Sequence, residues 1–195
     1  MAAFTFEIKL LHTDPGVTRV VKVSSDSSMY LLHHIIQQVM TWKNYHLYHF
    51  TIGERTIGDV RLLEEEAFGE VEDGKSIKVK DVFTHTGMVV EYLYDIGDYW
   101  EHEIQLIDIS DDPQTEALPI LVGGKNGSPP EDCGGVEGFI ECKRILSNPL
   151  HPEFTEMFEW VGRKSTPLRF NKKAAEKELS KLNAMIKMYE AGFSN

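Results

Sequence analysis

Two pairs of alternating apolar and polar segments, each pair joined by a turn, constrain the fold of this chain most. One turn is marked by Asp14-Pro-Gly16 and the other by Asp95-Ile-Gly-Asp98. Alternation with a period of two is typical of strands that bury one face. The sequence therefore predicts two antiparallel hairpins, formed by Phe4–Leu10 with Val17–Val23 and by Met88–Tyr94 with Trp100–Ile109.

A helix and a third strand are predicted between the hairpins. Ser24–Ser28 offers several N-caps, and the apolar residues after it recur at helical spacing. They are Leu32, Ile35, Ile36, Val39 and Met40. Tyr45–Ile52 follows as a strand, on which His46 and His49 would face opposite sides and so share no metal ion. The order strand, strand, helix, strand predicts a β-grasp-like N-terminal unit.

The rest of the chain adds helices and loops. We expect a loop with a short helix in Gly53–Gly74, a short strand in Ser76–Val82 and a long loop in Asp111–Gly135. Helices are predicted at Gly135–Ser147 and at Pro152–Val161. Asn171 would cap a last helix with an apolar stripe of Ala175, Leu179, Leu182, Ile186 and Tyr189. The predicted fold class is α+β, a mixed or antiparallel sheet with helices packed on it and helices at the C-terminus.

Size and composition predict one soluble domain. The chain has 195 residues, of which 42% are hydrophobic and 26% charged, as in ordinary globular proteins. We expect a single domain over residues 1–195. The sequence has no apolar run of membrane-spanning length and no signal-peptide pattern, so we expect a cytoplasmic protein without a membrane partner. Cys133 and Cys142 are expected to be reduced thiols.

Charge is distributed unevenly along the chain. The net charge is −11, which disfavours general nucleic-acid binding because phosphate contacts rely on clustered Lys and Arg. Residues 81–124 contain ten Asp and Glu and no Lys or Arg, whereas residues 163–187 contain eight basic residues and two acidic ones. The basic segment could pack on its own chain or meet a partner. Its apolar stripe favours internal packing.

Candidate functional residues concentrate in the second hairpin and in the Pro/Gly-rich segment after it. In the hairpin, His102 would lie beside Trp100 on the apolar face of its strand. We favour a hydrogen-bonded core histidine, and the alternative is a general base or metal ligand at the edge of a pocket. Asp95 and Asp98 lie in the turn, and Glu131 and Asp132 lie in the later loop.

These carboxylates allow a metal hypothesis. If the two segments meet, Asp95, Asp98, Glu131 and Asp132 with His102 would suit a hard divalent cation such as Mg²⁺ or Mn²⁺. The interpretation we favour is structural, because aspartates form Asx turns and caps. No cofactor is therefore expected, with a divalent cation as the alternative.

Two other motifs carry no further chemistry. Gly123-Gly-Lys-Asn-Gly127 lacks the Gly-Lys-Ser/Thr ending of a phosphate-binding loop. Glu131 or Asp132 with Glu141-Cys-Lys143 resembles the acidic core of a nuclease superfamily, but Glu141 falls in a predicted helix, where that core requires a strand.

Taken together, these motifs resemble the plasmid pRiA4b ORF-3-like family over nearly the whole chain. The centre of the family pattern is matched by Tyr92, Tyr94, Asp95, Gly97, Asp98, Trp100 and His102, with Ile96 in place of Phe. The later part is matched by Pro129, Pro130, Glu131, Asp132, Gly134, Gly135 and Gly138. Weaker matches are Leu32-His33, Trp42, His46-Leu47, Glu159-Trp160, Gly162 and Phe170-Asn171.

The departures from the pattern matter as well. Thr18 replaces the tryptophan before Arg19, and Thr41 replaces the glycine before Trp42. Some relatives carry further cysteines near the Pro-Pro motif, where this chain has Leu121 and Ser128, so a thiolate metal site is not expected here. The resemblance implies a protein of unknown function, and the link of some relatives to plasmids and transposition is an association rather than a mechanism.

Two function classes remain open. We favour a binding or interaction module with an acidic pocket for a protein or small-molecule ligand, and expect binding rather than catalysis. Its candidate residues are Tyr94, Asp95, Asp98, Trp100, His102, Glu131 and Asp132. The alternative is a divalent-metal-dependent hydrolase or nuclease using the same carboxylates, or a transposition-associated accessory protein.

Overall fold

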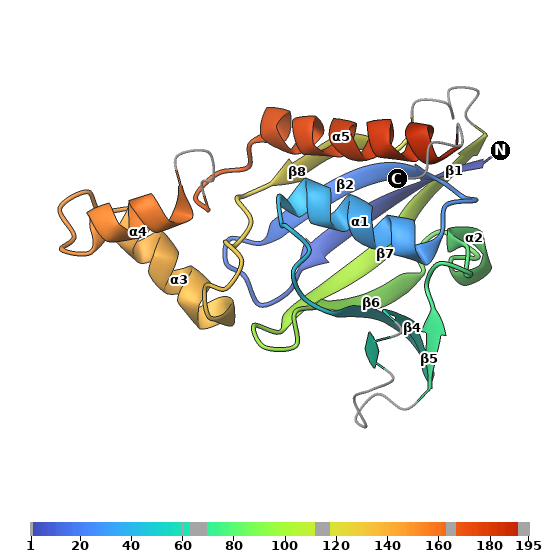
Figure 1. Cartoon of the computed structure of the whole chain (residues 1–195), viewed down its shortest axis with the longest axis horizontal. Helices are drawn as coiled ribbons and strands as arrows, with labels where there is room; N and C mark the ends of the chain where they lie inside the picture. Colours follow the sequence, from blue (N-terminus) through green and yellow to red (C-terminus); the bar gives the residue numbers. More distant parts are fainter. Residues whose placement is uncertain (1, 60, 63–69, 112–117, 163–166, 191–195) are drawn as a thin grey trace.

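A mixed sheet forms the centre of the protein (Figure 1). The computed structural model describes residues 2–59, 61–62, 70–111, 118–162 and 167–190. Within these ranges the sheet has eight strands in the order β5-β4-β3-β6-β7-β1-β2-β8. Neighbouring strands are antiparallel, except that β4 and β5 are parallel. The strands are β1 Ala2–Leu10, β2 Val17–Ser24, β3 Tyr48–Ile52, β4 Arg55–Gly58, β5 Val71–Asp73, β6 Val89–Tyr94, β7 Trp100–Asp111 and β8 Ile120–Lys125.

The helices lie on one face of this sheet and at one end of it. Helices α1 and α5 run side by side across the face, whereas α3 and α4 project from the end (Figure 1). Their bounds, with the short α2, are α1 Met29–Met40, α2 Val79–Val82, α3 Gly135–Leu146, α4 Phe154–Val161 and α5 Lys172–Glu190. Among the described residues, each helix is too short or too polar to cross a bilayer.

The core lies between the sheet and α1. Along β2 and most of β7, buried and partly exposed residues alternate, as the sequence pattern predicts. The apolar stripe of α1 is fully buried against these strands, and the Ser28 hydroxyl caps the helix by accepting from the Leu31 N–H at 3.1 Å. The predicted α+β class, both hairpins and this helix are therefore confirmed.

The β-grasp-like detail is not confirmed. Strand β3 does not pair with β1, because β6 and β7 lie between them in the sheet. The predicted strand Tyr45–Ile52 also begins later than expected, at Tyr48, and this leaves His46 in the connection between α1 and β3.

Two predicted segments are wrong, for different reasons. Ser76–Val82 is not a strand: Val79–Val82 forms a helical turn, because residues three apart, such as the buried Val79 and Val82, share one face of a helix but lie on opposite faces of a strand. The predicted loop Asp111–Gly135 contains β8. Its glycines suggested a turn, but a Cβ at Gly124 would lie only 2.7 Å from the Thr18 carbonyl oxygen, so this glycine permits the pairing of β8 with β2.

The segment Gly53–Gly74 differs from its predicted loop and short helix by containing β4 and β5, while residues 60 and 63–69 lie outside the described residues. The predicted helix Pro152–Val161 starts two residues later, at Phe154. Helix α3 matches its prediction closely and places Glu141 on a helix, whereas the nuclease-like Glu-Cys-Lys motif requires a strand there.

The basic C-terminal helix packs on its own chain. Asn171 caps α5, since its Oδ1 accepts from the Ala174 N–H at 3.1 Å, and Ala175, Leu179 and Leu182 are buried against α1 and β8. The side chains of Ile186 and Tyr189 lie outside the described part of the helix. Internal packing through the apolar stripe is confirmed for the described side chains.

Arg19 joins β2, α1 and the segment after β8. Its side chain is only 2% exposed, and burial lowers the pKa of the guanidinium to about 10. Every acceptor it reaches is a neutral oxygen, and its guanidinium stacks 4.1 Å from the Phe170 ring centre. The acceptors are the carbonyls of Thr18, Val39, Lys125 and Asn126 and the hydroxyl of Ser128. Arg19 therefore provides a hydrogen-bond donor for a carbonyl in the last turn of α1 and orients the segment that leads to Pro129.

Replacing Arg19 by methionine should destabilise the protein by about 2–4 kcal/mol, because buried carbonyls would lose their donor. Urea unfolding monitored by circular dichroism measures this loss. Arg55→Met is the matched control, since the exposed Arg55–Glu72 pair should contribute less than about 1 kcal/mol. Equal losses in the two variants would contradict this role of Arg19.

Candidate functional site

The second hairpin turn and the Pro/Gly-rich loop lie against each other. Asp98 Oδ2 accepts from the Gly134 N–H at 3.2 Å. Gly135 has φ of 68°, and a Cβ there would lie 2.8 Å from the Asp98 carbonyl oxygen. The two segments thus meet through close backbone contact that glycine permits.

Asp95 shapes the turn with one of its carboxylate oxygens. The residue has φ of 62°, and Oδ1 accepts from the N–H groups of Gly97 at 2.9 Å and Asp98 at 3.2 Å. This is an Asx turn, the structural role expected from the sequence. The side chain is nearly buried, and its other oxygen, Oδ2, points toward His46.

Glu131 fastens the Pro/Gly-rich loop to the sheet and to the end of α1. Its Oε1 accepts from the Tyr94 hydroxyl at 2.5 Å and its Oε2 from the Lys43 N–H at 2.7 Å. The Trp42 Nε1–H donates to the Pro129 carbonyl at 2.9 Å. Burial, together with the Glu131 carboxylate, raises the pKa of Tyr94 far above its usual range. Both Tyr94 and Glu131 therefore act in holding the loop.

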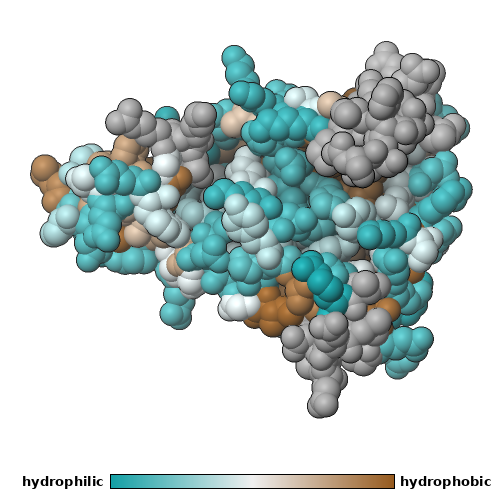
Figure 2. Space-filling model, viewed as in Figure 1, coloured by the Kyte–Doolittle hydropathy of each residue, from teal (hydrophilic) through white to brown (hydrophobic). Residues whose placement is uncertain are grey.

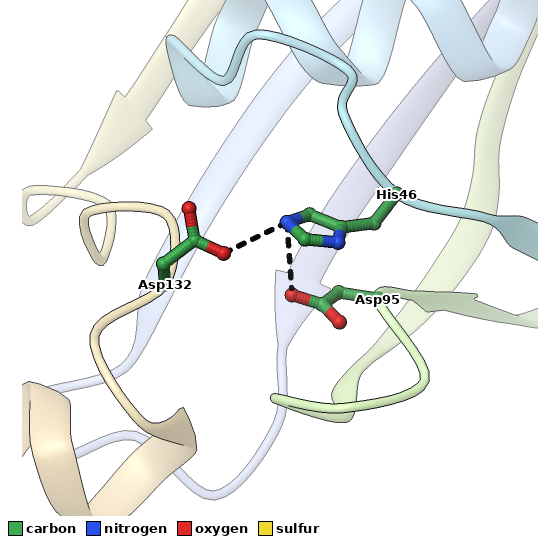
Figure 3. Close-up of side chains that lie close together, drawn as sticks. All are labelled: His46, Asp95 and Asp132. Atoms are coloured by element: carbon green, nitrogen blue, oxygen red, sulfur yellow. Dashed lines mark ion pairs between the residues drawn. The ribbon is translucent and has the colours of Figure 1, made fainter.

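A cluster of His46, Asp95 and Asp132 results from this arrangement (Figure 3). The three side chains come from the α1–β3 connection, the turn after β6 and the loop before α3, and they point toward one another. His46 Nε2 lies 2.9 Å from Asp132 Oδ1 and 3.5 Å from Asp95 Oδ2. All three potential ligand atoms lie within 4.8 Å of one another.

His46 Nε2 is buried, yet no carboxylate oxygen is aligned with it as a hydrogen-bond acceptor. The short distances from His46 Nε2 to the Asp95 and Asp132 oxygens therefore do not reflect hydrogen bonds. They fit either an ion pair or the joint coordination of a cation by the three atoms. Two chemical states fit this geometry: an imidazolium between two carboxylates, or a neutral imidazole whose lone pair faces a cation together with them.

An open cavity of about 460 Å³ adjoins the cluster. Asp95, Asp98 and Asp132 contribute to its wall, and Arg61 lies at its edge in an ion pair with Asp59. The cluster is therefore accessible to a small ligand from this side.

His102 lies away from the cluster, inside the core. It is 1% exposed, and Nδ1 lies 3.0 Å from the Trp100 carbonyl oxygen, so Nδ1 carries the proton. Nε2 is buried without a hydrogen-bond partner, and burial lowers the pKa of the imidazole to about 4. Trp100 is fully buried beside it. His102 is thus a buried histidine with one ring nitrogen bonded; neither it nor Trp100 lines the open cavity, and His102 contributes to the lining of a separate cavity of about 190 Å³.

Sequence reasoning missed His46 as a partner of the carboxylates. Of the predicted metal candidates, Asp95 and Asp132 lie together in the cluster. The Asp98 carboxylate instead accepts from the Gly134 N–H, and the Glu131 carboxylate accepts from Tyr94 and Lys43. His102 lies in the core. The signal that could have found His46 was its match to the family pattern as His46-Leu47. It was set aside because His46 was assigned to a strand.

The two cysteines lie at the back of this loop and are both free thiols. The neighbouring Cys142 thiol, together with burial, raises the pKa of Cys133 above its usual range, whereas the Cys133 thiol lowers the pKa of Cys142. The described geometry matches the expectation of reduced cysteines.

Sheet, loop and cluster together define an α+β protein with a His–Asp–Asp group where a hairpin turn meets a Pro/Gly loop. Residues 2–178 match the family described as plasmid pRiA4b ORF-3-like protein, and the chain belongs to that family.

Two relatives support this assignment. Uncharacterized protein y4hQ of Sinorhizobium fredii (strain NBRC 101917 / NGR234) is 34% identical over 158 residues, covering 80% of this chain and 79% of the relative. The crystal structure of the protein of unknown function MM3350 from Methanosarcina mazei Go1 is 28% identical, with a TM-score of 0.75, and the match covers 88% of this chain and 96% of that one. The family resemblance predicted from the sequence is confirmed.

The buried His102 should make stability depend on pH. Its pKa falls from 6.5 to about 4 on folding, so the unfolded chain binds a proton that the folded protein does not. Stability should therefore fall as pH decreases from 6.5 to 4, by about 3 kcal/mol in total from this residue, and be unaffected by it above that window.

Urea unfolding at pH 7 and pH 5 tests this dependence. His102→Gln should show a smaller loss between the two pH values than the wild type, because the titrating group is gone. His12→Gln, at an exposed residue paired with Glu101, serves as the control and should keep the wild-type dependence. An unchanged loss in His102→Gln would refute the assignment.

Proposed function

We propose that this protein is a binding module that holds a divalent cation between His46, Asp95 and Asp132 and presents it to a ligand in the adjoining cavity. One observation carries the proposal: a buried imidazole nitrogen and two carboxylate oxygens converge on one point without an aligned hydrogen bond between them. A cation at that point would give each of the three atoms a partner.

The spacing of the three atoms supports this function. Ligand atoms that lie about 2.1 Å from an ion, at angles of 90–110°, are about 3.0–3.4 Å from each other. The two distances from His46 Nε2, 2.9 Å to Asp132 and 3.5 Å to Asp95, are close to that range. The third distance, between the Asp95 and Asp132 oxygens, is at most 4.8 Å, so the exposed Asp132 side chain would move to complete the coordination.

The donor set favours particular metals. One imidazole nitrogen and two carboxylate oxygens suit Mn²⁺, Fe²⁺ or Zn²⁺ better than Ca²⁺, which prefers six or more oxygen ligands. Two carboxylates also neutralise the charge of a divalent ion. The ion and its three protein ligands would thus have no net charge.

The support of the ligands differs from one to another. Asp95 is fixed by the Asx turn, and its carboxylate is 8% exposed. Asp132 has φ of 58° and a side chain that is 62% exposed, so it can adjust to a bound ion. One fixed ligand, Asp95, and one adjustable ligand, Asp132, are suited to reversible binding of an ion.

A metal-dependent hydrolase is the second candidate, favoured by one observation. Three protein ligands leave coordination positions that face an open cavity, and catalytic metal sites keep such a position for water. Asp98 lines the same cavity and has the chemistry of a base. Hydrolysis of phosphate esters or peptides that depends on added Mn²⁺ or Zn²⁺ and is lost in Asp132→Asn would favour this candidate over binding alone.

Addition of Mn²⁺ or Zn²⁺ to metal-free protein should raise the melting temperature. At a concentration of one hundred times Kd the stabilisation is about 2.7 kcal/mol, which corresponds to roughly 5–10 °C for a chain of this size. The shift should exceed that with Ca²⁺ at the same concentration. Differential scanning fluorimetry measures it, and isothermal titration calorimetry gives the stoichiometry of one ion per chain.

His46→Gln and Asp132→Asn should abolish the shift. Asp98→Asn is the matched control: it removes a negative charge from the same cavity but lies outside the cluster, and asparagine can still accept from Gly134. The proposal fails if none of these metals shifts the melting temperature, or if Asp98→Asn removes the shift as completely as Asp132→Asn does.

A further inference from the structure

A second cavity lies on the other side of Asp132. It has a volume of about 240 Å³ and is formed by the segment after α1, the Pro129-Pro130 segment and the C-terminal end of α4. Tyr45 and Asp132 line both this cavity, which we call the aromatic cleft, and the open cavity at the metal cluster. The cleft has a different chemical character from its neighbour.

Three aromatic residues, Trp42, Tyr45 and Trp160, line the cleft. Tyr45 is 66% exposed and Trp160 is 51% exposed, although these are among the largest apolar side chains of the protein. They come from segments more than one hundred residues apart in sequence, and both line the same cleft. Apolar residues also reach the surface along the α3–α4 end in the view of Figure 2, where most of the remaining surface is hydrophilic. Exposed aromatics that gather at a cavity are typical of a binding surface.

Several N–H groups in the cleft wall are already used. The Trp42 Nε1–H donates to Pro129, the Lys43 N–H donates to Glu131, and the Tyr45 N–H donates to the Tyr94 hydroxyl. Pro129 and Pro130 have no N–H. Besides the Lys43 ammonium and the polar tips of Thr41, Tyr45 and Trp160, the wall offers a ligand π faces and carboxylates.

The charge of the wall favours a cation. Glu131, Asp132 and Lys43 all line the cleft, so its wall carries two negative charges and one positive charge, and Glu131 accepts its two hydrogen bonds from neutral groups. The ammonium of Lys43 lies 5.5 Å from the centre of the Tyr45 ring. This ring thus attracts a cation of the protein itself, which a ligand cation would displace.

We propose that the aromatic cleft binds an alkylated ammonium group, held by the rings of Tyr45 and Trp160 and by the negative charge of Glu131 and Asp132. Methyl groups on nitrogen suit apolar ring faces, and a quaternary nitrogen needs no hydrogen-bond acceptor. The group can belong to a free small molecule or to a trimethylated lysine side chain. This binding does not depend on a metal at the His46 cluster.

The two cavities share Asp132, so their ligands should influence each other. A divalent cation at His46 would neutralise Asp132 and weaken the attraction for an ammonium group in the cleft. The effect must be reciprocal, because coupling between two binding equilibria is symmetric.

Titration of the full chain with choline tests the proposal, with 3,3-dimethyl-1-butanol as its uncharged counterpart of the same shape. The protein is first treated with a chelator, so that failure of metal binding and failure of cation binding give separate results. Choline should bind at least about tenfold more tightly than the neutral alcohol, by calorimetry and by movement of one tryptophan indole N–H signal in NMR spectra. Equal binding of the two, or no binding of choline, overturns the proposal.

Variants locate the site. Trp160→Leu and Tyr45→Leu should each weaken choline binding about fivefold or more, and both residues are exposed enough for the fold to survive, which circular dichroism checks. Phe158→Leu is the control, since Phe158 is exposed on the same helix but does not line the cleft. Binding that survives in Trp160→Leu, or that is lost equally in Phe158→Leu, places the ligand elsewhere and overturns the assignment.

A peptide that contains trimethyl-lysine, compared with the same peptide containing lysine, identifies the source of the ammonium group. Tighter binding of the methylated peptide than of choline indicates a modified protein partner, and tighter binding of choline indicates a free small molecule. Each of these outcomes supports the proposal, whereas equal binding of the methylated and unmethylated peptides, with no affinity for choline, overturns it.

Discussion

The carboxylate of Glu131 is the interaction on which the rest of the site depends. It connects a strand residue, Tyr94, with the backbone that follows α1 at Lys43, and so fixes a long loop at the point where it passes both. The neighbouring bond from Trp42 to Pro129 holds the same loop two residues earlier. Together with the hydrogen bond between Gly134 and Asp98, these contacts position Asp132 relative to His46 and Asp95. Glu131, which the sequence offers as a metal ligand, thus acts by positioning another candidate ligand, Asp132.

The two cavities use the same loop for opposite kinds of chemistry. On one side of Asp132, donor atoms converge at the distances of metal coordination; on the other, aromatic faces surround a space whose walls accept more than they donate. Because both depend on the placement of residues 129–132, the distance between the two candidate ligands is set by a short stretch of backbone.

The sequence predicted what depends on local pattern and missed what depends on pairing at a distance. The hairpins, α1 and α5 were predictable because the alternation of apolar and polar residues in strands, and the helical spacing of apolar residues, indicate which face is buried. Strand β8 was not, since Gly123 and Gly124 suggest a turn unless the close approach of β2 is known. That the hairpin turn and the Pro/Gly-rich loop meet was stated from the sequence only as a condition of the site, and the contact between Asp98 and Gly134 is seen only in the structure. His46 was missed because its role requires knowing that β3 begins at Tyr48, a boundary that local patterns do not fix.

Asp95 performs two tasks with its two oxygens, one closing the turn and the other facing His46. A substitution at Asp95 would therefore alter hairpin closure and the cluster together, and its effects on stability and on ligand binding would be inseparable. The same coupling also runs from ligand to backbone. Occupancy of the cluster would restrain the carboxylate and thus the amides of Gly97 and Asp98, so that the opening rate of the hairpin tip would report on a ligand bound at its side.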